Sequence, residues 1–509
     1  MAIARVQSAA YLGVQAYLVT VEIDVAFGLP QLNIVGLPDA SVRESRERVR
    51  SAIKNSGFPF PNEKITINLA PADIKKEGPA FDLPIAISVL IAAGVIPQET
   101  LHGFVLMGEL ALDGTLRPTK GGLVIANGLK DQSAFIFPLE NAHEAAMEQG
   151  ATVYGVQSLA EVVQFLLKEK ILSPAVPADH TPSSAVQSLQ GLDFAEVKGQ
   201  PLAKRALEIA MAGGHNVLLI GPPGSGKTML ASRVPTILPP LEPEEQLEIM
   251  KIYSVAGLGE RPAAITRPPF RAPHYSASPP SLIGGGTWPK PGEISLAHHG
   301  VLFLDELPEF RKDVIESLRG PLEDGWISIS RSKLQTSFPC RFLLIAAMNP
   351  CPCGFLSDPK KNCHCSSTQI QKYQSRISGP ILDRIDLHVE VPSVSYPMLV
   401  QEASEESSAA IRERILNCRK IQRNRFSEMP LKLNARMHSR ELKRFAMPNT
   451  AGQKLLETAM LRLHFSARAY YKILKIARTI ADLAGAETVA APHVAEAIQY
   501  RSLDRARWG

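Results

Sequence analysis

A glycine-rich stretch lies between an apolar run and a helix-forming run, and its composition is typical of a loop that binds phosphate. Residues 216–220 before it predict a strand, and residues 229–234 after it predict the start of a helix. Glycines let backbone N–H groups close around phosphates, and the helix N-terminus adds its positive end. We expect Lys227 to contact the β- and γ-phosphates of ATP and the Thr228 hydroxyl to bind Mg²⁺. This P-loop comprises Gly221, Pro222, Pro223, Gly224, Ser225, Gly226, Lys227 and Thr228.

An acidic pair follows the apolar run at residues 301–304, further along the chain. Asp305 is expected to bind Mg²⁺ directly or through water, and Glu306 to orient and polarise the attacking water. An acidic pair at the end of a strand is common by itself. Downstream of a P-loop, it predicts a Walker B motif and therefore a nucleotide hydrolase that uses ATP and Mg²⁺.

Three further polar residues are candidates for contact with the γ-phosphate. Asn349 follows the apolar run at residues 342–348, and we expect it to lie between the two Walker strands, where AAA+ ATPases carry the sensor-1 residue. Residues 381–387 resemble the segment of magnesium-chelatase and replicative-helicase motors that carries the arginine finger, which makes Arg384 the candidate finger. The alternative for Arg384 is a surface ion pair. Arg468 opens a helix and fits a sensor-2 arginine, with Arg478 as the other candidate.

Four of the six cysteines lie close together in the sequence, as Cys351, Cys353, Cys363 and Cys365. Four thiols in two pairs match a closed tetrahedral zinc site, and no position is left open for catalysis. We expect a structural zinc site, while a redox switch or free thiols remain alternatives. Cys340 and Cys418 are isolated and are expected to be buried thiols.

The elements that position these residues fall into three predicted domains. Residues 1–171 alternate strand-like runs, such as residues 105–112, with helical runs, which indicates an α+β domain. Residues 172–190 are rich in Pro, Ser and Ala and read as a linker. Residues 191–394 alternate strands and helices and form the predicted α/β ATPase core, and residues 395–509 are helical throughout. The fold class is therefore α/β.

Composition excludes few functions but bounds the setting. The chain is 45% hydrophobic and 21% charged, which is ordinary for a soluble globular protein. Its longest apolar run, residues 83–95, contains Pro84 and is too short to span a bilayer, and no secretory leader is visible. We therefore expect a cytoplasmic protein without a membrane partner. Residues 401–509 hold 20 Lys+Arg and 11 Asp+Glu, a net charge of +9 that fits either contact with a polyanion or a solvated helical surface rich in arginine.

Several segments together resemble the YifB/ComM family of magnesium-chelatase-like AAA+ ATPases. They are residues 270–274, 282–286, 291–298, 300–307 and 376–390, together with the cysteine cluster. The resemblance implies a homohexameric ring with ATP bound between subunits. It also implies a helicase that acts on single-stranded or branched DNA and promotes branch migration in recombination, as in natural transformation. The C-terminal helical region would then be the AAA+ lid domain.

Residues 325–339 predict a hairpin of two alternating strands with a basic tip at Arg331 and Lys333. In related ring helicases, a hairpin at this place projects into the central channel. Arg331 and Lys333 would then contact DNA phosphates without reading bases. The alternative is an ordinary solvated tip, and residues 253–291 are a second candidate for the channel.

Two segments of the N-terminal domain, residues 75–82 and 108–123, resemble the proteolytic domain of Lon, which has the ribosomal S5 domain 2-like fold. Ala80 stands where Lon has its serine nucleophile, and Val124 where it has its lysine base; Lys120 belongs to a different position. Without a hydroxyl and an amine there is no activated nucleophile. We predict a Lon-like domain without peptidase chemistry. A magnesium-chelatase motor subunit and an ATP-driven protein remodelling factor remain alternative functions.

Overall fold

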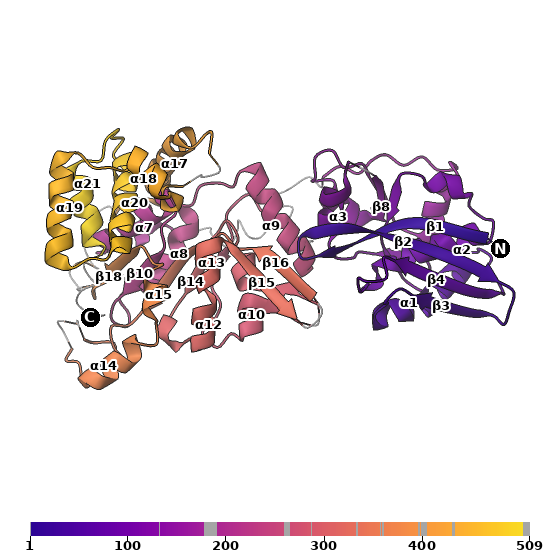
Figure 1. The fold of residues 1–509 in the computed structure, drawn as a ribbon, viewed down its shortest axis with the longest axis horizontal. Coiled ribbons are helices and arrows are strands. Elements are labelled where there is room, and N and C mark those ends of the chain that lie inside the picture. The colour runs from indigo at the N-terminus through magenta and orange to yellow at the C-terminus, as the bar shows by residue number, and fades with distance from the viewer. Residues whose placement is uncertain are drawn as a thin grey trace.

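The structure is a computed structural model that describes residues 2–131, 133–177, 191–258, 265–286, 288–331, 334–356, 358, 361–394, 398, 405–429 and 433–501. Figure 1 shows an elongated arrangement, with the N-terminal domain at one end, the C-terminal helices at the other and a central sheet between them. Among the described residues, no helix combines the length and the apolar character needed to cross a membrane.

The N-terminal domain is built on a seven-stranded sheet in the order β3-β4-β2-β1-β5-β8-β9. The β1–β2 and β2–β4 pairs are antiparallel, and the other neighbours are parallel. The strands are β1 (Ala2–Leu12), β2 (Gln15–Ala26), β3 (Gln31–Val35), β4 (Lys64–Ala70), β5 (Phe104–Leu106), β8 (Ala134–Pro138) and β9 (Val153–Val156). The helices are α1 (Ala40–Asn55), α2 (Asp82–Ala92), α3 (Gly122–Leu129), α4 (Leu139–Ala145) and α5 (Leu159–Leu166).

Two details of this domain follow from local chemistry. The apolar run with Pro84 is the buried helix α2, and the proline lies in the first turn, where its missing N–H costs no helical hydrogen bond. The run at residues 105–112, however, is not one strand. It divides into β5 and β6 (Glu109–Leu110), which pairs instead with β7 (Leu116–Arg117). The division falls at Gly108, where the Leu83 N–H binds the Gly108 carbonyl oxygen at 3.0 Å.

The central sheet has five parallel strands in the order β11-β14-β17-β10-β18. They are β10 (Val217–Ile220), β11 (Phe270–Arg271), β14 (Val301–Leu304), β17 (Leu343–Met348) and β18 (Leu387–Glu390). Strands β10 and β14 are buried along their whole length, as expected for a parallel sheet covered on both faces. Strand β17 lies between β14 and β10, so the expectation that Asn349 lies between the two Walker strands is confirmed.

The described elements after residue 405 are helical, as the sequence predicts. They include α17 (Ser408–Arg425), α18 (Ser439–Phe445), α19 (Thr450–Leu463), α20 (Ala467–Leu483) and α21 (Ala491–Gln499). Both α17 and α20 pack against α7 (Pro201–Gly213), the helix that precedes β10. Apolar residues of α7, β10 and α20 belong to one hydrophobic core, which fixes the helical region against the sheet.

The N-terminal domain contacts the ATPase core through the β1–β2 turn and α3. Helix α3 packs on α9 (Pro243–Ala256), and Tyr11 and Val124 join the apolar cluster that contains Ile327 and Phe338. The last two residues belong to the hairpin of β15 (Trp326–Arg331) and β16 (Leu334–Pro339). A methyl group on Gly13 would lie 3.2 Å from the Ser337 carbonyl oxygen, so the turn rests directly on this hairpin (Figure 1).

Candidate functional site

The P-loop joins β10 to α8 (Lys227–Arg233) and approaches other backbone segments closely. A Cβ on Gly221 would collide with the Val391 carbonyl oxygen, so only glycine fits there. Gly226 has a φ of 92° and stands at the N-cap of α8, a conformation that favours glycine. The Gln200 amide, 3% exposed, donates to the carbonyl oxygens of Ser225 at 3.2 Å and Pro392 at 2.7 Å. It therefore fixes the P-loop to the end of β18, a role the sequence did not reveal.

Lys227 holds its ammonium group at the centre of the loop. Its Nζ donates to the carbonyl oxygens of Gly221 at 2.8 Å and Pro222 at 2.9 Å, and to Asn349 Oδ1 at 3.2 Å. The side chain is 8% exposed. Burial lowers the pKa of Lys227, and the negative charges of Asp305 and Glu306 oppose that shift. The structure thus brings together the P-loop lysine and the proposed sensor-1 residue.

The Walker B residues complete this site from the neighbouring strand. The Thr228 hydroxyl donates to Asp305 Oδ2 at 2.6 Å, so the two predicted Mg²⁺ ligands lie side by side. Hydroxyl and carboxylate oxygens are hard donors of the kind that Mg²⁺ prefers, and their convergence fits the ion. Glu306 has a φ of 52°, in the left-handed region that non-glycine residues rarely adopt. Such strain is concentrated at functional sites, where it aims a side chain.

Arg384 lies outside this constellation within one chain. Its side chain is 13% exposed and forms an ion pair with Glu323 of α13 (Arg319–Asp324). Its Nη1 also donates to the Pro380 carbonyl oxygen at 2.7 Å. Within the single chain, Arg384 therefore forms an ion pair, which is the alternative to the arginine finger. The arginine finger remains a prediction, because it requires the nucleotide site of a second subunit.

The two sensor-2 candidates lie in very different surroundings. Arg478 is 2% exposed and binds Asp482 at 2.8 Å and the Ala486 carbonyl oxygen at 2.6 Å inside the helical region. Arg468 lies in the first turn of α20 with a side chain 67% exposed, and its Nη1 donates to Asp383 Oδ2 at 2.9 Å. Arg478 is therefore a buried structural residue, and Arg468 is the candidate whose guanidinium is exposed. Its partner Asp383 precedes Arg384, which places Arg468 beside the finger segment.

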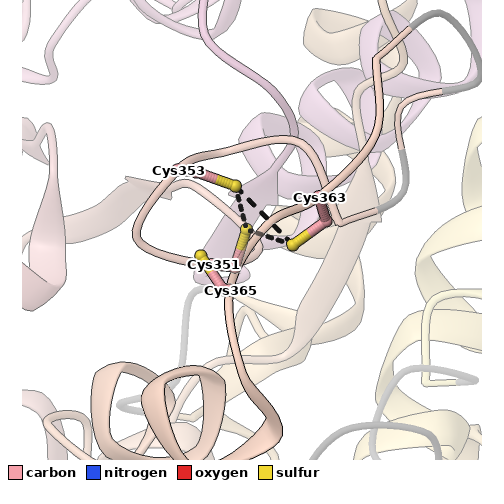
Figure 2. A group of neighbouring side chains, drawn as sticks. All are labelled: Cys351, Cys353, Cys363 and Cys365. Carbon is pink, nitrogen blue, oxygen red and sulfur yellow. Dashed lines mark hydrogen bonds between the residues drawn. The ribbon is translucent and has the colours of Figure 1, made fainter.

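The four clustered cysteines lie together as the zinc prediction requires. Figure 2 shows their side chains directed toward one another, and their Sγ atoms all lie within 4.8 Å of one another. Cys351 Sγ is 3.4 Å from Cys353 Sγ and 3.7 Å from Cys363 Sγ, and the last two are 3.6 Å apart. Sulfur ligands at about 2.3 Å from a tetrahedral Zn²⁺ are about 3.8 Å apart. Thiolates are also the ligands that zinc favours, so the residues fit this ion.

The predicted hairpin is confirmed, but its basic tip is not described. Strands β15 and β16 pair antiparallel, with Arg331 opposite Leu334. The Arg331 side chain and Lys333 lie outside the described residues. The predicted DNA contacts of both residues therefore remain predictions.

The two positions matched to the Lon dyad have ordinary structural roles. The Ala80 carbonyl oxygen accepts a hydrogen bond from the Gly108 N–H at 2.9 Å. Val124 is 1% exposed and packs into the cluster that joins the N-terminal domain to the ATPase core. Lys120 lies beside Gly257 at the end of α9, so its side chain belongs to the same contact between domains.

A group of three residues ahead of β14 was not predicted. Glu248 Oε2 lies 2.9 Å from His298 Nε2 and 2.7 Å from His299 Nε2. The Arg341 N–H donates to His298 Nδ1 at 2.9 Å, so the imidazole proton is on Nε2 and that atom cannot bind a metal. Burial lowers the pKa of His298 to about 4, which keeps the ring neutral. These residues fix α9 to the start of the Walker B strand. The one sequence signal for this group is that His298 and His299 are adjacent in the chain.

Comparisons with known proteins agree over nearly the whole chain. Three family profiles match: "Magnesium chelatase, subunit ChlI" over residues 193–399, "Subunit ChlI of Mg-chelatase" over 21–141, and "Magnesium chelatase, subunit ChlI C-terminal" over 405–501. The chain is 45% identical to competence protein ComM of Haemophilus influenzae, covering 99% of this chain and 98% of that one. It is 43% identical to the uncharacterized protein YifB of Escherichia coli, with the same coverage. The magnesium-chelatase subunit ChlI of Chlamydomonas reinhardtii is 24% identical over 23% of this chain and 24% of that one.

Proposed function

This chain belongs to the magnesium-chelatase-like AAA+ family of ComM and YifB, and we propose on that basis that it is an ATP-driven DNA motor. In full, the proposal is a homohexameric, cytoplasmic helicase or translocase that promotes branch migration in DNA recombination. The observation that carries it is the convergence of Lys227, Thr228 and Asp305 at one edge of the central sheet, in a chain similar throughout to a competence protein.

The proposed hydrolysis follows from the positions of the side chains. Lys227 would exchange its bonds to P-loop carbonyls for phosphate oxygens, and Thr228 and Asp305 would hold Mg²⁺, whose charge would neutralise that of the phosphates. Glu306 orients the attacking water, and Asn349, directly after β17, contacts the γ-phosphate as the sensor-1 residue. Arg384 acts on the nucleotide of the neighbouring subunit, and Arg468 senses or stabilises the γ-phosphate as a sensor-2 arginine. The four-cysteine cluster holds a structural Zn²⁺, and its thiols suit a reducing compartment.

The alternative functions are less well supported. The pairwise match to the Chlamydomonas magnesium-chelatase subunit is 24% identical over 23% of the chain, whereas the match to ComM is 45% identical over 99%. A porphyrin-metallating motor would have no evident use for the cysteine cluster. A protein remodelling factor would be expected to expose an aromatic-hydrophobic channel loop, and no segment of the sequence stands out as one. The relative from Haemophilus influenzae is named a competence protein, which favours DNA over a porphyrin or a protein as the substrate of this chain.

The proposal is tested by migration of a synthetic Holliday junction by the purified protein. We expect wild-type protein to move the junction with ATP and Mg²⁺, and Glu306→Gln protein to bind the junction and ATP without moving it. Porphyrin metallation with a partner subunit and unfolding of a model protein serve as parallel assays. ATP hydrolysis without junction movement or DNA stimulation would refute the DNA motor.

A second prediction concerns the tip of the β15–β16 hairpin. Replacing Arg331 and Lys333 together by serine should abolish DNA stimulation of ATP hydrolysis while leaving hydrolysis without DNA unchanged. If each residue contacts one phosphate, the slope of log K against log[salt] should fall by about 1 per residue. The matched control is Arg311→Ser, because Arg311 is an exposed arginine paired only with nearby Asp313 among its described contacts. An unchanged salt slope would remove the hairpin from the DNA contact.

A further inference from the structure

We propose that the cysteine cluster is a metal-held clamp on the nucleotide site, so that losing its metal weakens ATP binding. The inference rests on the proposed zinc and ATP sites and adds a coupling between them. Two structural connections carry it, one through direct packing on the P-loop and one through the chain that leads into the cluster.

The first connection is a contact between the cluster and the P-loop. Gly354 lies between the two cysteine pairs and has a φ of 84°. A methyl group added there would lie 2.7 Å from Pro223 Cγ, so the backbone of the cluster packs directly on the second proline of the P-loop. The Gly354 N–H donates to the Cys351 carbonyl oxygen at 3.0 Å, which closes a tight turn between ligand and contact. A change in the position of Cys351 is therefore passed to Pro223.

The second connection runs along the chain from the sensor. Asn349 accepts a hydrogen bond from Lys227, and only Pro350 separates Asn349 from Cys351. Cys351 is fully buried, and the Gln374 amide donates to the Pro350 carbonyl oxygen at 3.0 Å. Gln374 ends α14 (Ser367–Gln374), whose N-cap Ser366 directly follows Cys365. The cluster thus fixes Pro350, which directly follows Asn349, and α14, which bonds to Pro350 through Gln374.

The physical reason for the coupling is that the metal joins the two cysteine pairs. Without the cation the sulfur atoms, 3.4–3.7 Å apart, take up protons and no bond holds the pairs together, so the turn depends on the metal for its shape. If the metal leaves, the support of Pro223 and Asn349 is weakened together. Coupling between two binding sites is reciprocal, so bound nucleotide must in turn raise the affinity of the cluster for the metal.

The experiment measures metal content and nucleotide affinity on the full-length protein. Wild-type protein should carry one zinc per chain, and Cys363→Ser should lose it and bind a fluorescent ATP analogue about tenfold more weakly, within the usual range of such couplings. Cys418→Ser is the matched control, because Cys418 is a buried thiol in α17 outside the cluster. It should keep both the metal and the affinity.

Two further measurements keep the inference testable if Cys363→Ser does not fold. Gly354→Ala should retain zinc yet weaken nucleotide binding, because its methyl group meets Pro223 while the four ligands are intact. In wild-type protein, saturating ATP analogue should raise the chelator concentration that removes half of the zinc at equilibrium. Zinc-free folded protein with unchanged nucleotide affinity, or purified protein without bound metal, would overturn the clamp. Failure of wild-type protein to bind nucleotide would instead refute the proposed ATPase.

Discussion

Replacing Lys227 by alanine is expected to abolish ATP hydrolysis and to weaken nucleotide binding severely. The ammonium group donates three hydrogen bonds inside the site, two of them to P-loop carbonyl oxygens and one to Asn349. Each charge-assisted bond that is transferred to a phosphate oxygen contributes about 1.5–3 kcal/mol. Loss of the group should therefore reduce kcat/KM at least about 100-fold. Steady-state phosphate release and binding of a fluorescent ATP analogue measure the two effects.

The matched control for this variant is Lys454→Ala. Lys454 is an exposed lysine of α19, outside the nucleotide site, and its removal should leave turnover unchanged. Circular dichroism should show that both variants are folded. Normal ATP hydrolysis by the Lys227→Ala protein would show that the P-loop assignment is wrong, whatever the protein does to DNA.

The convergence of Lys227, Asp305 and Asn349 could be predicted from the sequence because its signals are local. A glycine-rich turn between a strand and a helix, and an acidic pair after a buried strand, each specify a structure within about ten residues. Parallel strands then bring the carboxyl ends together, so Asp305 and Asn349 are positioned by the sheet that their own flanking residues build. The proximity of the four cysteines could also be predicted, because all four lie on one short segment of the chain.

The contacts that escaped prediction join residues far apart in the chain. Arg384 pairs with Glu323 across 61 residues, and Gln200 reaches Pro392 across 192. The sequence favoured Arg468 over Arg478 as the sensor-2 arginine but did not show that Arg478 is buried. Its bond to Asp482 spans only one helical turn, yet its burial depends on packing within the helical region. The sequence likewise indicated the elements of the N-terminal domain but not its contact with the β15–β16 hairpin, because that contact depends on how two domains pack.

The ion pair between Arg384 and Glu323 bears directly on the finger hypothesis. Glu323 is itself largely exposed, and Arg384 holds its pKa below the usual value. The Glu323 carboxylate is exposed, so Arg384 can exchange this partner for a phosphate oxygen, but its guanidinium is only 13% exposed and must also leave the Pro380 carbonyl oxygen. Arg468 lies beside this segment through its bond to Asp383.

Arg384→Ala is therefore expected to bind ATP normally but to hydrolyse it about 10³-fold more slowly, the loss typical of a missing arginine finger. Arg376→Ala is the control, because Arg376 belongs to the same segment and pairs with Glu309 of its own chain. Mixing inactive Arg384→Ala and Glu306→Gln proteins should restore turnover, because an Arg384→Ala subunit keeps Glu306 and can receive Arg384 from its neighbour. In an equal random mixture of rings, about one quarter of the interfaces would be complete. Full activity of Arg384→Ala would refute the finger, and a mixture as inactive as its components would show that Arg384 does not act across subunits.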